Sequence, residues 1–263
     1  MINKKLITYY RYFYEYVKHG DLLSIIASLR YLINRTSHKK DRIIQTSIGT
    51  FFCRKNTNDF QYSNYRYEWG VKQFLLDNIK NYNVFIDGGA CVGEYCILLT
   101  KLGISCIAFE PVIANYKVLT KNLELNNMSD KVLAFSIGLG DREMQAPFYF
   151  NPINTGASHI ITDGRPADCF VEIRTFDSLL PRLGLKSEDR ILCKLDIESM
   201  EPDAIRGAAG FIRNFPNITF VAEGKHSGDD IIKKELTAIT GFEFGIVDPY
   251  NIYAKKIVST QSN

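Results

Sequence analysis

The stretch NVFIDGGACVG, residues 83–93, decides the fold of this chain. It opens with apolar residues typical of a buried strand, reaches Asp87, and ends in small residues up to Gly93. Small residues at the end of a strand are typical of a place where a ligand comes close to the backbone. The stretch therefore predicts a strand, a turn and a helix, with a ligand site at the turn.

Strand and helix patterns alternate through the rest of the chain, with a strand-rich interruption at 146–175. Predicted strands cover 83–87, 104–109, 131–137, 190–196, 217–222, 242–247 and 251–256, and predicted helices cover 68–79, 93–102, 112–126, 176–182, 201–213 and 228–239. This alternation predicts an α/β fold with a mostly parallel, doubly wound, seven-stranded sheet that ends in an antiparallel C-terminal hairpin. Such sheets bind ligands at the carboxyl ends of their strands.

The first 42 residues differ from the rest in charge and pattern. They hold nine Lys or Arg against three Asp or Glu, a net charge of +6 in a chain whose total is +3. Residues 4–34 have a helical pattern with a break at 19–21. We therefore expect two parts, an N-terminal basic, aromatic, helical extension over residues 1–42 and a ligand-binding domain over residues 43–263.

The stretch YYRYFYEY, residues 9–16, contains six aromatic side chains and basic neighbours. Such a helix is a candidate for peripheral membrane contact through residues 1–34. The helical spacing of its apolar residues favours docking onto the domain or onto a second copy in a homodimer. We expect no specific nucleic-acid partner.

Composition places the chain among ordinary globular proteins, with 46% hydrophobic and 23% charged residues. Its six cysteines form no CxxC pair, and no apolar run is long enough to span a bilayer. The first residues lack the pattern of a secretory leader. These observations predict a soluble, cytoplasmic protein.

Three classes of ligand site use a glycine-rich turn after the first strand. A phosphate-binding loop needs a lysine after its last glycine, and none follows Gly93. A dinucleotide fingerprint needs a middle glycine that lets pyrophosphate approach, and Ala90 stands there. An S-adenosylmethionine site needs D-x-G-x-x-x-G, which Asp87, Gly89 and Gly93 provide. An acid at this turn suits a cationic ligand, and the glycine backbone makes room for its chain.

Glu110 ends the next predicted strand, in the stretch IAFEP. Its carboxylate can accept hydrogen bonds from both hydroxyls of a ribose. Because NAD and S-adenosylmethionine both carry a ribose, Glu110 alone leaves both ligands open.

At this point the sequence resembles the FkbM family of methyltransferases. VFIDGGACVGEY resembles the family opening D-x-G-A-x-x-G-x-Y, with matches at Asp87, Gly89, Ala90, Gly93 and Tyr95. Further resembling stretches are IAFEPVIANYKVLTKNLELNN (107–127), SIGLGD (136–141), NTGASHI (154–160), RTFDSLL (174–180), LCKLDIESMEPDAIRGAAGFI (192–212) and PNITFVAE (216–223). Together they cover about residues 43–247.

One position departs from the family pattern. The family has glycine after D-x-E, and this chain has Ser199. We therefore expect the backbone turn beside Asp196, and with it the acceptor pocket, to differ in detail from the family.

The resemblance implies S-adenosyl-L-methionine as the cofactor and S-adenosyl-L-homocysteine as the product. The residues that it implies for cofactor binding lie at four strand ends and in the turns that follow them. They are Asp87, Gly89, Ala90, Gly93, Glu110, Pro111, Ser136, Gly138, Asp141 and Asp196. Asp141 is a candidate for the adenine amino group.

Methyl transfer to a hydroxyl needs alignment of donor and acceptor and a general base. The fourth and fifth strands end in KLDIES and AEGKH, which supply Asp196, Glu198, Glu223 and His226 as catalytic candidates. Asp196 could act as the base, or it could bind Mg²⁺ together with Glu223. The sequence does not decide whether a metal ion is bound. Candidate acceptor contacts lie in the segments 60–69, 154–160 and 224–229.

The family resemblance implies an S-adenosylmethionine-dependent O-methyltransferase. The acceptor that we expect is a sugar hydroxyl, nucleotide-activated and destined for surface polysaccharide or glycan biosynthesis. Two alternatives stay open at this stage. One is an NAD-dependent oxidoreductase on the same sheet, and Ala90 weighs against it. The other is a non-catalytic interaction protein that works through its N-terminal segment.

Overall fold

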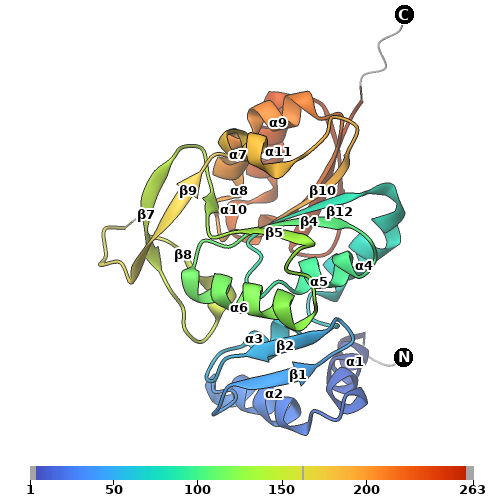
Figure 1. Ribbon diagram of the computed structural model, residues 1–263, viewed down its shortest axis with the longest axis vertical. Coiled ribbons are helices and arrows are strands. Elements are labelled where there is room, and N and C mark those ends of the chain that lie inside the picture. Colours follow the sequence, from blue (N-terminus) through green and yellow to red (C-terminus); the bar gives the residue numbers. More distant parts are fainter. Residues whose placement is uncertain (1–3, 162, 259–263) are drawn as a thin grey trace, which may run out of the picture.

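The computed structural model describes residues 4–161 and 163–258. A seven-stranded sheet runs through the centre of the molecule, in the order β12-β13-β11-β10-β3-β4-β5 (Figure 1). Its strands are β3 (Val84–Gly88), β4 (Ser105–Phe109), β5 (Val132–Phe135), β10 (Arg190–Leu195), β11 (Asn217–Glu223), β12 (Phe242–Ile246) and β13 (Asn251–Lys256). β3, the strand that precedes the glycine-rich turn, lies in the middle of the sheet between β10 and β4.

The strand directions confirm the predicted sheet. β3, β4, β5, β10 and β11 pair in parallel, whereas β13 is antiparallel to both β11 and β12. The last two strands thus form the predicted antiparallel hairpin. Because the parallel strands all end at one edge, the side chains that follow them gather there.

Helices cover both faces of the sheet, and the alternation of side chains along β3 shows why. Phe85 packs with α4 (Trp69–Asn78), α5 (Glu94–Thr100) and α6 (Ile113–Leu125). Val84 and Ile86 point to the other face, in a cluster with α7 (Phe176–Leu183), α8 (Glu201–Gly207), α9 (Ala209–Asn214) and α11 (Asp229–Ile239). A strand buried on both faces is mostly apolar, as residues 84–86 of β3 are.

The predicted helix 201–213 is wrong as one element, because the structure divides it into α8 and α9. Asp177 of α7 accepts hydrogen bonds from the backbone N–H groups of Gly210 and Phe211, each at 2.7 Å. This carboxylate caps a new helix start, so α9 begins with its own first turn. The loop predicted after β11 also contains a short helix, α10 (Gly224–Ser227).

The strand-rich segment forms a second sheet beside the central one. Its order is β6-β9-β7-β8, from β6 (Gly138–Leu139), β7 (Met144–Tyr149), β8 (His159–Ile160) and β9 (Cys169–Arg174). In Figure 1 this sheet projects to the left of the central sheet. A 3-10 turn, η2 (Thr155–Ala157), lies between β7 and β8.

The N-terminal segment consists of α1 (Lys4–Lys18), α2 (Leu22–Asn34), the hairpin β1 (Arg42–Gln45) and β2 (Thr50–Cys53), and the short helix α3 (Asp59–Tyr62). The predicted break at 19–21 is confirmed, and Asp21 caps α2 by accepting a hydrogen bond from Ser24 N at 3.2 Å. Another 3-10 turn, η1 (Ile79–Asn81), follows α4.

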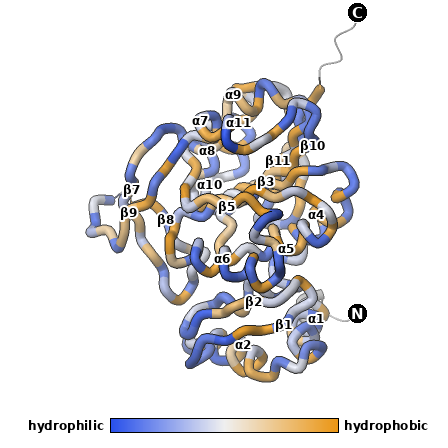
Figure 2. The backbone as a smooth tube through the Cα atoms, viewed as in Figure 1, coloured by the Kyte–Doolittle hydropathy of each residue, from blue (hydrophilic) through white to orange (hydrophobic). Residues whose placement is uncertain are grey.

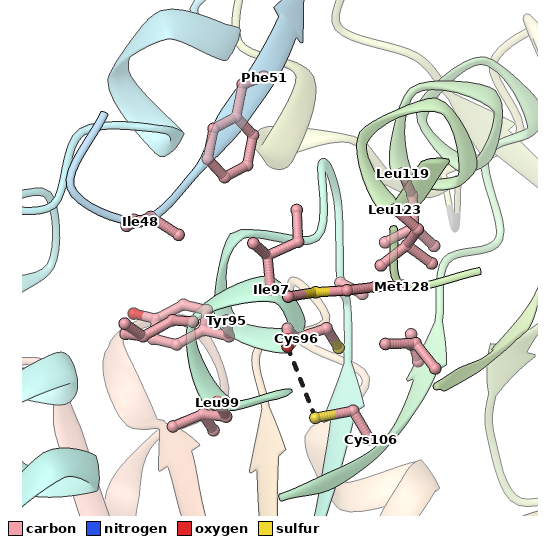
Figure 3. Packing of buried hydrophobic residues seen from close by; sticks show 14 of the residues in the cluster. Ile48, Phe51, Tyr95, Cys96, Ile97, Leu99, Cys106, Leu119, Leu123 and Met128 are labelled. Carbon is pink, nitrogen blue, oxygen red and sulfur yellow. Dashed lines mark hydrogen bonds between the residues drawn. The ribbon is translucent and has the colours of Figure 1, made fainter. Parts of the chain in front are cut away.

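The N-terminal hairpin packs on α6, on the outer side of the helical layer. Phe52 N donates to Asn122 Oδ1 at 2.7 Å, and Thr50 N donates to Asn126 Oδ1 at 3.1 Å. Figure 3 shows Ile48 and Phe51 in one hydrophobic cluster with residues of α5 and α6. The hairpin and the central domain therefore share one core.

Exposed apolar and aromatic side chains lie along α1 and α2, and hydrophobic colour is clear on parts of α2 in Figure 2. Tyr10, Val17, Leu22, Leu29 and Ile33 are each at least half exposed. Within the described part of the chain, no helix is long and apolar enough to cross a membrane. An exposed apolar surface of this kind is typical of an interaction surface.

Candidate active site

The glycine-rich turn joins β3 to α5 and needs both of its spaced glycines. Gly89 has φ +88° and Gly93 has φ +85°, in the left-handed region that disfavours other residues. A Cβ at Gly89 would lie 2.0 Å from the carbonyl oxygen of Asp196, and one at Gly93 would lie 2.5 Å from Leu119 Cδ1. The turn is therefore pressed between β10 and α6, and no larger residue fits at either glycine.

Glu110 follows β4 and is almost completely buried beside this turn. Its carboxylate accepts backbone hydrogen bonds from Cys91 N at 3.0 Å and from Val112 N at 2.8 Å, and a longer one from Asn115 Nδ2 at 3.4 Å. Burial raises the pKa of Glu110 to about 7, although these hydrogen bonds favour the ionised form. Glu110 thus connects the glycine-rich turn to the start of α6.

A pocket opens between these turns and the second sheet. Six of the predicted site residues line it, namely Gly89, Glu110, Pro111, Gly138, Asp196 and Glu198. Its walls also include apolar side chains from both sheets, among them Phe109, Ile137, Leu139, Phe148, Ile160 and Ile173. An apolar pocket with a few convergent carboxylates is the usual form of a small-molecule site.

The loop 154–158 closes one side of this pocket and is held by the aromatic-rich segment around α3. Tyr62 OH donates to Asn154 Oδ1 at 2.7 Å and accepts from Gly156 N at 2.9 Å. Thr155 N donates to Asn58 Oδ1 at 3.1 Å. Two of the three segments predicted to contact the acceptor, 60–69 and 154–160, therefore meet beside the pocket.

The other predicted cofactor residues lie apart from the pocket lining. Asp87, Ala90 and Gly93 are part of the turn and its supporting strand. Ser136 follows β5 outside the lining, and Asp141 faces Arg206 at 3.7 Å. Cofactor contact by Ser136 and Asp141 stays a prediction.

A buried group of charges lies around the glycine-rich turn, and sequence reasoning missed most of it. Lys72 of α4 is fully buried, and Glu94 and Asp87 are nearly so. Lys72 Nζ donates to the backbone carbonyl of Tyr67 at 2.6 Å and lies 4.8 Å from the ring centre of Tyr95. No motif marks Lys72, since its only sequence signal is a charge inside an otherwise amphipathic helix.

Burial dominates the titration of these carboxyls. It raises the pKa of Asp87 to about 6 and that of Glu94 to about 8, while nearby Lys194 and Lys72 act in the opposite direction. Within the described residues, Asp87 Oδ1 and Glu94 Oε2 have no hydrogen-bond partner. Unpartnered buried acceptors of this kind are suited to receive donors from a ligand.

Asp196 lies just beyond β10, at the edge where the parallel strands end. Lys194 Nζ is 2.7 Å from Asp196 Oδ2, and Asp196 N donates to the carbonyl oxygen of Gly88 at 3.1 Å. Burial alone would lower the pKa of Lys194, but Asp196, Glu68 and Asp87 raise it overall. Asp196 is thereby fixed between the glycine-rich turn and a permanently charged lysine.

Glu198, Glu223 and His226 form a group, and its two carboxyls feel the charge of Asp196. His226 Nε2 is 3.7 Å from Glu198 Oε2. Burial, reinforced by Asp196, raises the pKa of Glu223 to about 8 and that of Glu198 to about 7. The structure therefore brings together all four residues predicted to be catalytic.

Glu201 has a role that its place near a helix start did not reveal. Its Oε1 accepts a hydrogen bond from Ile197 N at 2.8 Å, and its Oε2 accepts one from Ser227 Oγ. Buried Glu201 thus ties the turn after β10 to α10, where His226 resides. Glu201 therefore holds the turn that carries Glu198 next to the helix that carries His226.

The departure from the family glycine has a structural consequence at Ser199. Ser199 has φ +81°, so the turn keeps the left-handed backbone that glycine adopts without strain. We predict that Ser199→Gly raises the free energy of unfolding by about 1 kcal/mol. Urea unfolding of the two proteins measures this difference. A destabilised Ser199→Gly variant would show instead that the serine side chain holds the turn.

A second prediction concerns pH and Glu110. The pKa of Glu110 rises from 4.5 to about 7 on folding. The neutral form of Glu110 therefore stabilises the folded state by roughly 3 kcal/mol. This contribution is fully present below about pH 4.5 and is lost as the pH rises through 7. Glu110→Gln stays neutral, so the variant should gain stability relative to the wild type between pH 4.5 and pH 8. Urea unfolding across this range tests it, and a constant difference would contradict it.

The geometry defines a class of protein. It is an α/β enzyme in which the glycine-rich turn after β3 and Glu110 after β4 form a nucleoside-binding pocket. Residues 87–244, more than half of the chain, match the family model described as the methyltransferase FkbM domain. The chain belongs to the FkbM methyltransferase family. It is an S-adenosylmethionine-dependent methyltransferase with the corresponding seven-stranded fold. Among curated proteins, none matches the sequence.

Solved structures with a similar fold are distant in sequence. The methyltransferase FkbM from Methylobacillus flagellatus has 16% identity and a TM-score of 0.48, covering 66% of this chain and 44% of that one. A SAM-dependent O-methyltransferase from Thermotoga maritima has 13% identity and a TM-score of 0.45, covering 84% and 78%. An O-methyltransferase from Bacillus cereus, in complex with S-adenosylhomocysteine, has 12% identity and a TM-score of 0.42, covering 72% and 80%. The chain thus spans less than half the length of the Methylobacillus protein.

The residues present fit S-adenosylmethionine. Oε2 of Glu110 accepts one backbone hydrogen bond and keeps a lone pair for a ribose hydroxyl, and Oε1 has only the long 3.4 Å bond from Asn115 Nδ2 beside its backbone bond. The apolar walls at Ile137 and Phe148 suit a purine ring, and the unpartnered oxygen of Asp87 adds negative charge for a cationic ligand. Gly89 lines the pocket with backbone alone. The cofactor supplies a methyl group activated by a sulfonium sulfur.

Proposed function

We propose that the protein transfers this methyl group to a hydroxyl of a sugar, as an O-methyltransferase acting on a nucleotide-activated precursor of a surface polysaccharide or glycan. The observation that carries the proposal is the position of Asp196. This carboxylate lines the same pocket as Gly89 and Glu110, so a base and the cofactor site share one cavity.

When bound, S-adenosylmethionine would supply the methyl group to the acceptor oxygen and would leave as S-adenosylhomocysteine. Asp196 accepts the proton that the hydroxyl loses. Lys194 donates to one oxygen of Asp196, and within the described residues the other oxygen accepts no hydrogen bond. The close packing of Asp196 on Gly89 fixes the base relative to the cofactor turn, and such alignment supplies much of the rate.

The rest of the lining supports an acceptor with several hydroxyl groups. Thr155, Ser158 and Glu198 add hydroxyl and carboxylate groups to the pocket, and Phe148 adds an aromatic face. Hydroxyl and carboxylate groups can exchange hydrogen bonds with a sugar, and the aromatic ring can pack on its apolar face.

Family membership favours methyl transfer over the two alternatives, hydride transfer with NAD and non-catalytic binding. A cytoplasmic location is also part of the proposal, and the six free cysteines are consistent with it. The division at residue 42 stays a prediction. A membrane contact or a homodimer through α1 and α2 stays a prediction as well, supported by their exposed apolar side chains.

An acceptor screen tests the proposal. The purified protein is incubated with S-adenosylmethionine and a panel of nucleotide sugars, with primary amines as a comparison set, and S-adenosylhomocysteine is quantified. We expect turnover with a nucleotide sugar and a loss of about 10²–10⁴-fold in Asp196→Asn. The exposed Asp130→Asn is the matched control. Turnover with amines alone, or full activity of Asp196→Asn, would contradict the proposal.

A further inference from the structure

Three side chains beside the pocket have the composition of a metal site. One ligand atom from each of Glu198, Glu223 and His226 lies within 4.8 Å of the other two. Ligands of one divalent ion, each about 2.1 Å from the metal, lie about 3–4 Å apart. The 3.7 Å between His226 Nε2 and Glu198 Oε2 is already in this range. Only a small rotation of side chains would bring all three onto one ion.

The three side chains are also free to bind. Among the residues that the structure describes, the carboxylates of Glu198 and Glu223 accept no hydrogen bond, and the polar contact of the His226 ring is the 3.7 Å approach to Glu198. Asp196, by contrast, already has Lys194 at 2.7 Å. The hypothesis of Mg²⁺ shared by Asp196 and Glu223 therefore gives way to a different set of ligands, in which Asp196 has no part.

Negative charge predominates at this edge of the sheet, which favours the binding of a cation. Glu198 and Glu223 are partly buried, and each feels the negative charge of Asp196 and of Glu201. Lys194 and Lys225 offset part of this repulsion at Glu198. A divalent ion between the carboxylates would remove the remainder.

We propose that Glu198, Glu223 and His226 bind one divalent first-row metal ion, which holds the acceptor hydroxyl against the cofactor pocket. One imidazole with two carboxylates suits Mn²⁺ better than Mg²⁺, which prefers oxygen ligands alone. Glu198 also lines the pocket, so the ion is held by a side chain that faces the acceptor. A hydroxyl bound to a divalent ion loses its proton more readily, which makes a carboxylate such as Asp196 a sufficient base. The role of the ion rests on the proposed function, whereas its binding does not.

The test is a titration in which Mn²⁺ is added to the full chain in the presence of saturating S-adenosylhomocysteine. Free Mn²⁺ is followed by electron paramagnetic resonance. We expect one site, and a loss of affinity of roughly tenfold or more in His226→Ala and in Glu223→Gln. The matched control is His19→Ala, because His19 lies beside Glu15 at the N-terminal hairpin, away from this cluster. Melting temperatures and S-adenosylhomocysteine affinity, both measured for each variant, separate loss of the metal site from loss of the fold.

Two results would overturn the metal site. One is the absence of Mn²⁺ binding up to about 1 mM, and the other is binding that both variants retain. Mg²⁺ binding as tight as Mn²⁺ binding would overturn the assignment of His226 as a ligand. Failure of the acceptor screen with Mn²⁺ binding intact would instead overturn the sugar acceptor and leave the metal site standing.

Discussion

Replacing Glu110 by alanine should weaken binding of S-adenosylhomocysteine by about 100-fold or more. A hydrogen bond to a charged group contributes about 1.5–3 kcal/mol, and Glu110 would accept two from the ribose. The same change removes the acceptor for Cys91 N and Val112 N, so the turn itself would loosen. Isothermal titration calorimetry with S-adenosylhomocysteine measures the effect, with NAD⁺ run alongside.

Glu110→Gln separates the two contributions. Its amide oxygen still accepts one backbone hydrogen bond, so the turn is better preserved than in Glu110→Ala. We expect Glu110→Gln to bind S-adenosylhomocysteine with an affinity between those of the wild type and the alanine variant. Unchanged binding in both variants would mean that the ribose lies elsewhere. Tighter binding of NAD⁺ than of S-adenosylhomocysteine by the wild type would contradict the cofactor assignment.

Lys194→Met should lower the free energy of unfolding by about 3–5 kcal/mol, because it leaves buried carboxylates without their cation. Lys194 is 3% exposed and lies 2.7 Å from Asp196. Asp87 is also among the charges that it compensates. Urea unfolding at neutral pH measures the loss, and the melting temperature should fall by roughly 10 °C.

Two further variants show whether loss of the Lys194–Asp196 pair causes the fall in stability. Lys233→Met removes a lysine from a surface pair with Asp230, and it should cost less than about 1 kcal/mol. The double variant Lys194→Met with Asp196→Asn should be less destabilised than the sum of the two single changes, because it removes both charges. A loss below 1 kcal/mol in Lys194→Met would contradict a buried charge pair.

The sequence predicts most of the central sheet and the cofactor side of the site. Local signals are strong there, since β3 is a short apolar run that ends at an acid, and Glu110 occupies the same place after β4. The N-terminal helix break was equally local, because Gly20 and Asp21 supply both a stop and a cap. Features that arise within a few residues can be predicted in this way.

Features that arise between distant segments could not be predicted. Lys72 and Glu94 are ordinary surface residues by type, and only the folded chain shows that they are buried together. The start of α9 depends on Asp177, which belongs to a different helix. Similarly, the convergence of Glu198 with His226 depends on α10 and on Glu201, neither of which has a sequence signature.

The contact between Gly89 and Asp196 limits how this enzyme can be re-engineered. The carbonyl oxygen of Asp196 occupies the space of the missing Cβ at Gly89, although the two residues are more than 100 positions apart in the chain. A chimera that exchanged only the first segment for that of another methyltransferase would place a foreign turn against an unaltered Asp196. The two segments form one interlocked module, and they would have to be transplanted together for donor and acceptor to stay in line.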